Sequence, residues 1–181
     1  NKNMLTIAAL LEFVNSAAVV GIAVVIFPII KQFNERVALA YLSFRIIEAA
    51  MLLVGTVALL SLINVSKELV EASASNVNYF HTMADILRAE RYMNFQLGML
   101  PLALCGFILC LTFYQYRLIP RALSTLGLFG YVLLLLKVVS DFFAIDLGGQ
   151  LLYIPGALFE LFLPLWLFFK GFHLAEKVQE D

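Results

Sequence analysis

Residues 123–144, with the sequence LSTLGLFGYVLLLLKVVSDFFA, decide the fold class of this chain. A helix rises about 1.5 Å per residue, so this segment is long enough to cross the roughly 30 Å hydrocarbon core of a bilayer. Its charged side chains are Lys137 and Asp141, and the rest of the segment is mostly apolar. The segment therefore predicts a transmembrane helix that carries an embedded lysine and an embedded aspartate.

Four other apolar segments of similar length occur in the chain. The five predicted spans are residues 5–27, 38–63, 92–114, 123–144 and 151–172. The whole chain is 62% hydrophobic and 14% charged, against about 45–50% and 25% in soluble domains. We therefore expect an all-α, polytopic membrane bundle, integral in the lipid bilayer, with five transmembrane helices in a single domain of residues 1–181.

The connection of residues 64–91 is the one long connection between predicted spans. In its second half, Val77, Phe80 and Leu87 recur at helical spacing, and Asp85 and Arg88 fall elsewhere on the same helix. This pattern predicts an amphipathic helix that lies on the membrane surface or caps the bundle.

Composition and motifs argue against several function classes. Twelve basic and thirteen acidic residues give a net charge of −1 without a basic stripe, so we expect no nucleic-acid partner. No phosphate-binding loop, dinucleotide fingerprint or Gly-x-Ser-x-Gly motif occurs. His81 and His173 fall on opposite sides of the predicted membrane and cannot share a metal. We expect no metal, no cofactor and no catalytic residue.

Charged residues inside the predicted spans are the informative feature of the sequence. They are Glu12, Arg45, Glu48, Lys137, Asp141 and Glu160. A charge at mid-membrane costs roughly 2.5–3.5 kcal/mol on insertion scales, so these side chains must pair, neutralise or line water. Arg45 and Glu48 are three residues apart, one helical turn, and this spacing predicts a buried pair that points into the bundle.

The remaining charges predict a second, outer polar cluster. With the helical rise, Glu12, Lys137 and Glu160 fall at about the same depth, about 10–13 Å below the outer boundary. The candidate polar cavity consists of Glu12, Asn15, Lys137, Asp141 and Glu160. We expect Lys137 to lie within reach of Glu12 or Glu160, and the cavity to bind or translocate a small solute, an ion or a proton.

Two alternatives remain open at this point. Buried pairs often fix helix register without any chemistry, so the protein is alternatively a non-catalytic accessory or scaffold subunit of a larger membrane complex. Its partners are then other membrane subunits or a second copy of the chain. The third class is an intramembrane enzyme with carboxylate acid–base chemistry, which the sequence favours least because no nucleophile accompanies the carboxylates.

Basic residues in the short loops predict the orientation. The turns at residues 31–36 and 116–121 and the C-terminus fall on one side, because short turns make neighbouring helices antiparallel. Their cations are Lys31, Arg36, Arg117, Arg121, Lys170 and Lys177. Short loops rich in lysine and arginine favour the cytoplasm. The C-terminus is therefore expected inside and residue 1 outside, which suggests a further helix before residue 1.

Three stretches carry a resemblance to a known family. They are SFRIIEAA at residues 43–50, YRLIPRALS at residues 116–124 followed by Gly127, Gly130 and Tyr131, and LWLFFKG at residues 165–171 preceded by Glu160. Over residues 22–172 the chain resembles the prokaryotic multi-pass membrane family known as domain of unknown function 4386. The resemblance implies a six-helix parent architecture with one more N-terminal helix and a prokaryotic plasma membrane, and it carries no activity or catalytic residue.

Overall fold

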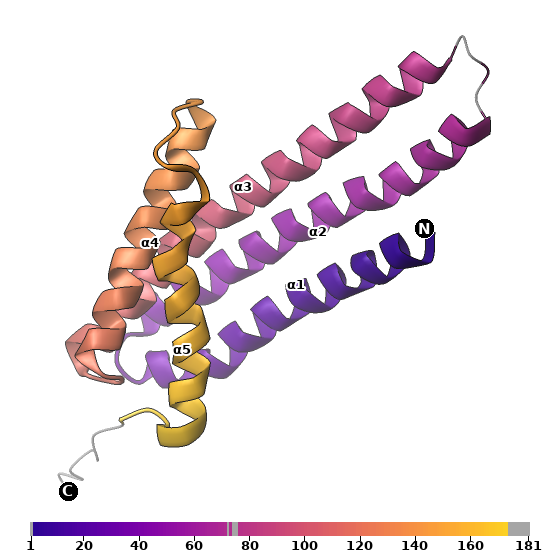
Figure 1. Ribbon diagram of the computed structural model, residues 1–181. Coiled ribbons are helices and arrows are strands. Elements are labelled where there is room, and N and C mark those ends of the chain that lie inside the picture. Colours follow the sequence, from indigo (N-terminus) through magenta and orange to yellow (C-terminus); the bar gives the residue numbers. More distant parts are fainter. Residues whose placement is uncertain (1, 72, 74–75, 174–181) are drawn as a thin grey trace, which may run out of the picture. The chain divides into compact units, whose positions relative to one another are not determined.

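The computed structural model describes residues 2–71, 73 and 76–173, and this part of the chain is helical without any strand. Figure 1 shows the helices in chain order. They are α1 (Lys2–Lys31), α2 (Glu35–Glu71), α3 (Val77–Tyr116), α4 (Arg121–Phe142), the short 3-10 helix η1 (Gly149–Tyr153) and α5 (Ile154–Lys170). The expected all-α fold class is confirmed.

Within the described residues, five helical segments are long and apolar enough to cross a membrane. They are Asn3–Lys31, Glu35–Glu71, Val77–Tyr116, Arg121–Phe142 and Gly149–Lys170. Each contains the core of one predicted span, and the last joins η1 to α5. The expectation of five membrane-spanning helices in this chain is therefore confirmed.

The connection between the second and third spans differs from the expectation. Residues 77–91 are the first part of α3 rather than a separate surface helix, and α2 continues to Glu71. The reason is local, because no glycine or proline interrupts residues 77–97. At about 1.5 Å per residue, α2 and α3 are about 56 and 60 Å long, roughly twice the hydrocarbon thickness. Their helical ends therefore extend well beyond a bilayer core.

The chain forms two compact units. The first unit comprises residues 1–28 and 42–101, and the second comprises residues 29–41 and 102–181. In the first unit, α1, α2 and α3 lie side by side (Figure 1). Gly98 of α3 lies against α2, because a Cβ there would be 3.5 Å from the Met51 Cβ and 3.6 Å from the Glu48 carbonyl oxygen.

The second unit is built on a close contact between α4 and α5. A Cβ on Gly130 would come within 2.6 Å of the Gly156 Cα, so only glycine at position 130 allows the two backbones to approach this closely. On the same face of α4, a Cβ on Gly127 would meet the Cys110 sulfur at 2.5 Å and the Phe159 ring at 2.8 Å. Small residues on one face of α4 therefore set the packing of this unit.

Candidate functional site

Glu12 is the centre of a polar contact among three helices of the first unit. Its Oε1 lies 2.5 Å from Nη2 of Arg91 on α3, and its Oε2 accepts a hydrogen bond from the Thr56 hydroxyl of α2 at 2.9 Å. The side chains of Arg91 and Glu12 are 38% and 31% exposed. The pair is therefore accessible, and its two residues are 79 positions apart in the sequence.

A cavity of about 510 Å³ opens beside this pair. Its lining residues are Glu12, Asn15, Leu52, Gly55, Arg88, Arg91, Tyr92 and Phe95. The volume falls within the range of small-molecule sites. Arg88 is exposed and lies 2.7 Å from Asp85, so its positive charge is partly balanced by a side chain outside the lining. The lining itself carries two cations and one carboxylate.

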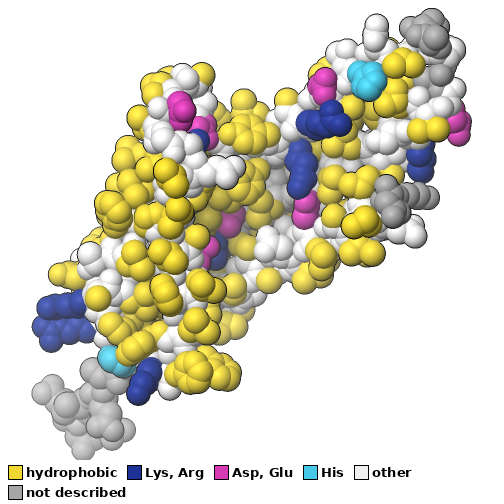
Figure 2. Space-filling model, viewed as in Figure 1, with side chains coloured by type: hydrophobic (Ala, Val, Ile, Leu, Met, Phe, Trp, Pro, Cys, Tyr) yellow, Lys and Arg dark blue, Asp and Glu magenta, His cyan; other side chains and the backbone are white. Residues whose placement is uncertain are grey.

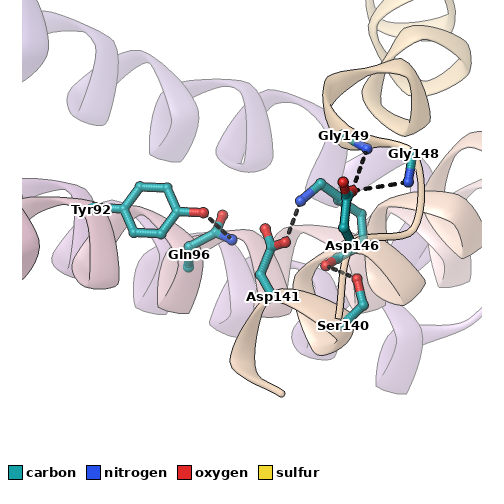
Figure 3. A network of polar contacts seen from close by, with 8 residues as sticks. Tyr92, Gln96, Ser140, Asp141, Asp146, Gly148 and Gly149 are labelled. Atoms are coloured by element: carbon teal, nitrogen blue, oxygen red, sulfur yellow. Dashed lines mark hydrogen bonds and ion pairs between the residues drawn. The ribbon is translucent and has the colours of Figure 1, made fainter. Parts of the chain in front are cut away.

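The sequence of α3 places the cavity side chains on one helical face. Arg88, Arg91, Tyr92 and Phe95 follow one another at spacings of three, one and three residues, which keeps them together on a helix. The buried Gln96 donates from Nε2 to the Tyr92 hydroxyl at 3.2 Å, as Figure 3 shows. This bond orients the Tyr92 ring at the cavity wall.

Arg45 and Glu48 form an ion pair on α2. Nη1 of Arg45 lies 2.7 Å from Oε2 of Glu48, and the two side chains are 13% and 3% exposed. This is the geometry that the three-residue spacing indicates. The pair is buried and local to one helix, and neither residue lines the cavity described above.

Lys137 and Asp141 lie in the second unit, on α4. They form an ion pair at a spacing of four residues, with side chains 10% and 16% exposed. The Ser140 hydroxyl donates to the Lys137 carbonyl oxygen at 2.8 Å. Figure 3 shows Asp141 and Ser140 near the end of α4, with Asp146 accepting the N–H groups of Gly148 and Gly149 in the turn that follows.

Glu160 lies on α5 and contacts a different partner. Its Oε1 accepts a hydrogen bond from the Tyr131 hydroxyl of α4 at 3.1 Å. The Tyr131 ring packs edge-on against Phe159, with 5.8 Å between the ring centroids. This carboxylate therefore takes part in the contact between α4 and α5.

The predicted cavity residues are thus divided between the two units. Glu12 and Asn15 line the cavity of the first unit, and Lys137, Asp141 and Glu160 belong to the second. The expected contact of Lys137 with Glu12 or Glu160 stays a prediction. What the structure adds is the set of contacts that each of these residues makes within its own unit.

The sequence reasoning missed three residues of this site. Arg88 and Arg91 line the cavity, and Arg91 and Thr56 bond to Glu12. The two arginines were assigned to an outer connection, although α3 runs through them without a break. The signal available was the helical spacing of residues 88, 91, 92 and 95, which continues directly into the predicted span. A continuous helix places Arg91 one residue before that span and within reach of a carboxylate in a neighbouring helix.

The comparisons with known proteins identify a family and no activity. A family model described as Domain of unknown function (DUF4386) matches residues 1–171. No curated protein and no solved structure matches the chain.

Proposed function

The chain belongs to the family described as Domain of unknown function (DUF4386), and we propose that it binds a small amphipathic anion in the cavity of the first unit. The observation that carries the proposal is the juxtaposition of two arginines with an aromatic wall. Arg88 and Arg91 line one part of the cavity, and Tyr92 and Phe95 line the part next to it. Binding of this kind is the first step that a receptor or a transporter requires.

The charge of the lining supports an anion over a cation. Arg88 and Arg91 outnumber Glu12, so the wall carries a formal charge of +1. Guanidinium groups bind carboxylates and phosphates through several parallel N–H donors. One nitrogen of Arg91 bonds to Glu12, and a guanidinium has five N–H donors in total. An incoming oxyanion can therefore bond to Arg91 while its contact with Glu12 persists.

The position of the cavity along the helices supports an amphipathic ligand. The apolar run of α3 begins at Tyr92, directly after Arg91. Along α3 the wall therefore changes from the two arginines to Tyr92 and Phe95, in the direction in which the apolar run continues. A ligand with an anionic head and a short apolar body fits this gradient, because the head would contact the arginines and the body would contact the aromatic side chains.

Saturation-transfer NMR with three probes of one shape tests this function. Benzoate, benzylammonium and benzyl alcohol differ mainly in charge, and the full chain is studied in phosphatidylcholine nanodiscs. We expect benzoate to bind, benzyl alcohol to bind weakly and benzylammonium not to bind. A charged hydrogen bond contributes about 1.5–3 kcal/mol, so Arg88→Gln weakens benzoate binding about tenfold or more.

Lys67→Gln is the matched control for this experiment. Lys67 is an exposed cation on α2 of the same unit and does not line the cavity. This variant therefore loses the same charge and keeps the affinity for benzoate. Equal binding of the three probes, or an equal loss in both variants, contradicts the proposed site.

We also propose a prokaryotic plasma membrane as the location, with the end of α5 in the cytoplasm. The support is the short basic turns at residues 31–36 and 116–121 and Lys170 at the end of α5. A cysteine introduced at Gly149, in the opposite turn, is expected to react with a membrane-impermeant maleimide added to intact cells. The natural thiols of Cys105 and Cys110 are buried and serve as an internal blank. Protection of the new cysteine in intact cells contradicts this orientation.

An accessory role in a larger membrane complex is the second candidate function. The observation that favours it is the apolar face of α1, on which Leu10, Phe13 and Val14 are exposed. Lipid or a partner helix covers such a face. In native membranes, a photo-crosslinking residue at position 13 is expected to join the chain to a defined partner or a second copy if this role holds. Crosslinks to lipid alone contradict it and leave the binding function standing.

A further inference from the structure

A second cavity, an apolar groove of about 550 Å³, lies in the second unit between the start of α4 and the end of α5. Its lining residues are Pro120, Ala122, Leu123, Leu126, Phe162, Leu165, Trp166, Phe169 and Lys170. Eight of these nine residues are apolar or aromatic, and the ninth is a cation. The groove is separate in sequence from the cavity of the first unit, and its chemistry differs.

The cationic end of the groove lies next to the turn between α3 and α4. Helix α5 ends at Lys170, and Gly171 adopts a φ of 68°, which turns the chain. The backbone N–H of His173 then donates to the Leu118 carbonyl oxygen at 2.9 Å. This bond places the end of α5 beside the turn that carries Arg117 and Arg121.

Positive charge predominates at this end of the second unit. Residues 29–41 reach it as well, because the Phe33 and Tyr116 rings lie 4.8 Å apart. The described charges here are the cations Lys31, Arg36, Arg117, Arg121 and Lys170 and the carboxylate of Glu35, which pairs with Lys31. Five cations and one carboxylate give a formal charge of +4. Figure 2 shows dark blue side chains beside yellow ones at this end of the molecule.

We propose that the groove binds an acyl chain of an anionic phospholipid, with the lipid phosphate at Lys170. The helices on both sides of the groove are long and apolar enough to lie in a membrane, so acyl chains surround it. Basic pockets between membrane helices bind anionic headgroups, and juxtamembrane cations attract them. Arg117 and Arg121 add to the positive potential at the phosphate.

Charge also distinguishes this occupant from a second copy of the chain. A symmetric pair of chains that met at this groove would bring two basic ends together, and their like charges would repel. An anionic lipid instead neutralises the cation at the end of the groove. The aromatic lining of Phe162, Trp166 and Phe169 presents an apolar surface to its chain.

Native mass spectrometry of the full chain in detergent tests the proposal. Phosphatidylglycerol and phosphatidylcholine with the same acyl chains are added separately, and we expect one phosphatidylglycerol to be retained in preference to phosphatidylcholine. A cation near the surface contributes about 1 kcal/mol to anionic lipid binding, so Lys170→Gln lowers phosphatidylglycerol retention about fivefold. Ala122→Trp, which places an indole in the groove at an exposed position, lowers the retention of both lipids.

Two control variants and one short probe separate the alternatives. Arg36→Gln removes an exposed cation from the same end without touching the groove, and Arg88→Gln alters the cavity of the first unit. Both are expected to retain phosphatidylglycerol better than Lys170→Gln does. Glycerol 3-phosphate, which has no acyl chain, is expected not to displace the lipid.

Several results would overturn the proposal. They are equal retention of the two lipids by the unmodified chain, an equal loss in Arg36→Gln and Lys170→Gln, displacement by glycerol 3-phosphate, and a dimer that Ala122→Trp dissociates. A loss in Arg88→Gln alone would move the lipid to the first unit and also overturn it. Because Lys170→Gln and Ala122→Trp alter the groove, and Arg88→Gln alters the benzoate site, failure of one proposal is distinguishable from failure of the other.

Discussion

The first unit and the second unit each contain an ion pair, and the two pairs are built differently. The Glu12–Arg91 pair joins two helices, whereas the Lys137–Asp141 pair lies within one helix. Glu12 and Arg91 lie on α1 and α3, and their side chains are 31% and 38% exposed. Lys137 and Asp141 are one turn apart on α4, and their side chains are 10% and 16% exposed. The first pair lines a cavity, and the second lines neither of the two cavities described above.

The difference teaches what each pair contributes. A pair within one helix forms as soon as the helix forms, so it lowers the cost of placing both charges in a membrane before any packing occurs. A pair between helices forms only when the helices meet, so it selects their register. Partial exposure then leaves acceptor and donor positions available to a ligand. We therefore assign stability to the local, buried pairs and binding to the pair between helices.

The buried pair on α2 is expected to give the largest effect on stability. Glu48→Ala removes the carboxylate 2.7 Å from Arg45, and an arginine cannot release its proton. Breaking a buried pair from one side costs about 3–5 kcal/mol, to be measured by unfolding in mixed detergent micelles. The double variant Arg45→Met with Glu48→Leu is expected to recover most of that loss. Equal losses in the single and double variants would show that pairing is not the cause.

Asp141→Ala is expected to give a smaller loss than Glu48→Ala. It breaks the same kind of local pair, but the partner is a lysine near the end of α4, whose flexible stem lets its ammonium turn toward water. We expect an unfolding free energy lower by about 2–3 kcal/mol, somewhat below the usual range for a buried pair. Lys137→Met with Asp141→Leu serves as the paired control. Benzoate binding is expected to be unchanged in both variants, and a loss of binding would contradict the division of roles between the two pairs.

The sequence predicted features that depend on neighbouring residues and missed those that depend on packing. Apolar runs predict the five membrane helices, because in lipid the backbone N–H and C=O groups of each run must form their hydrogen bonds within one helix. The spacing of Arg45 and Glu48 gives their contact for the same local reason. The contact of Glu12 with Arg91 depends on how α1 and α3 pack, and no spacing encodes it. Depth alone grouped Glu12 with Lys137 and did not single out Arg91, because depth does not say which helices are neighbours.

The boundaries of α2 and α3 show where a hydrophobicity rule loses information. Polar residues after position 63 and before position 92 ended the predicted spans, since apolar runs mark only the part of a helix inside the hydrocarbon. The helices themselves continue to Glu71 and begin at Val77. Arg88 and Arg91 were therefore placed in a separate surface helix and left out of the predicted cavity residues, which include Glu12 and Asn15 of the observed wall.

Glu12→Gln is expected to give the smallest effect on stability and a gain in benzoate binding. The pair is more than 30% exposed, so its loss costs about 0–1 kcal/mol of unfolding free energy. The amide oxygen of the variant takes the place of Glu12 Oε2 and accepts the hydrogen bond from the Thr56 hydroxyl. The cavity wall changes from +1 to +2, and Arg91 regains the donor that it shared with the carboxylate.

Benzoate should therefore bind Glu12→Gln about two- to fivefold more tightly than the unmodified chain, since up to about 1 kcal/mol of competition is removed. Saturation-transfer titrations at two salt concentrations measure this gain, and it should shrink at high salt because the pair is accessible to screening. Thr56→Val is the matched control, because it removes the other contact of Glu12 without changing the charge of the wall. Weaker benzoate binding in Glu12→Gln would mean that the carboxylate positions Arg91 for the ligand rather than competing with it, and the assignment of Glu12 as a competitor would be wrong.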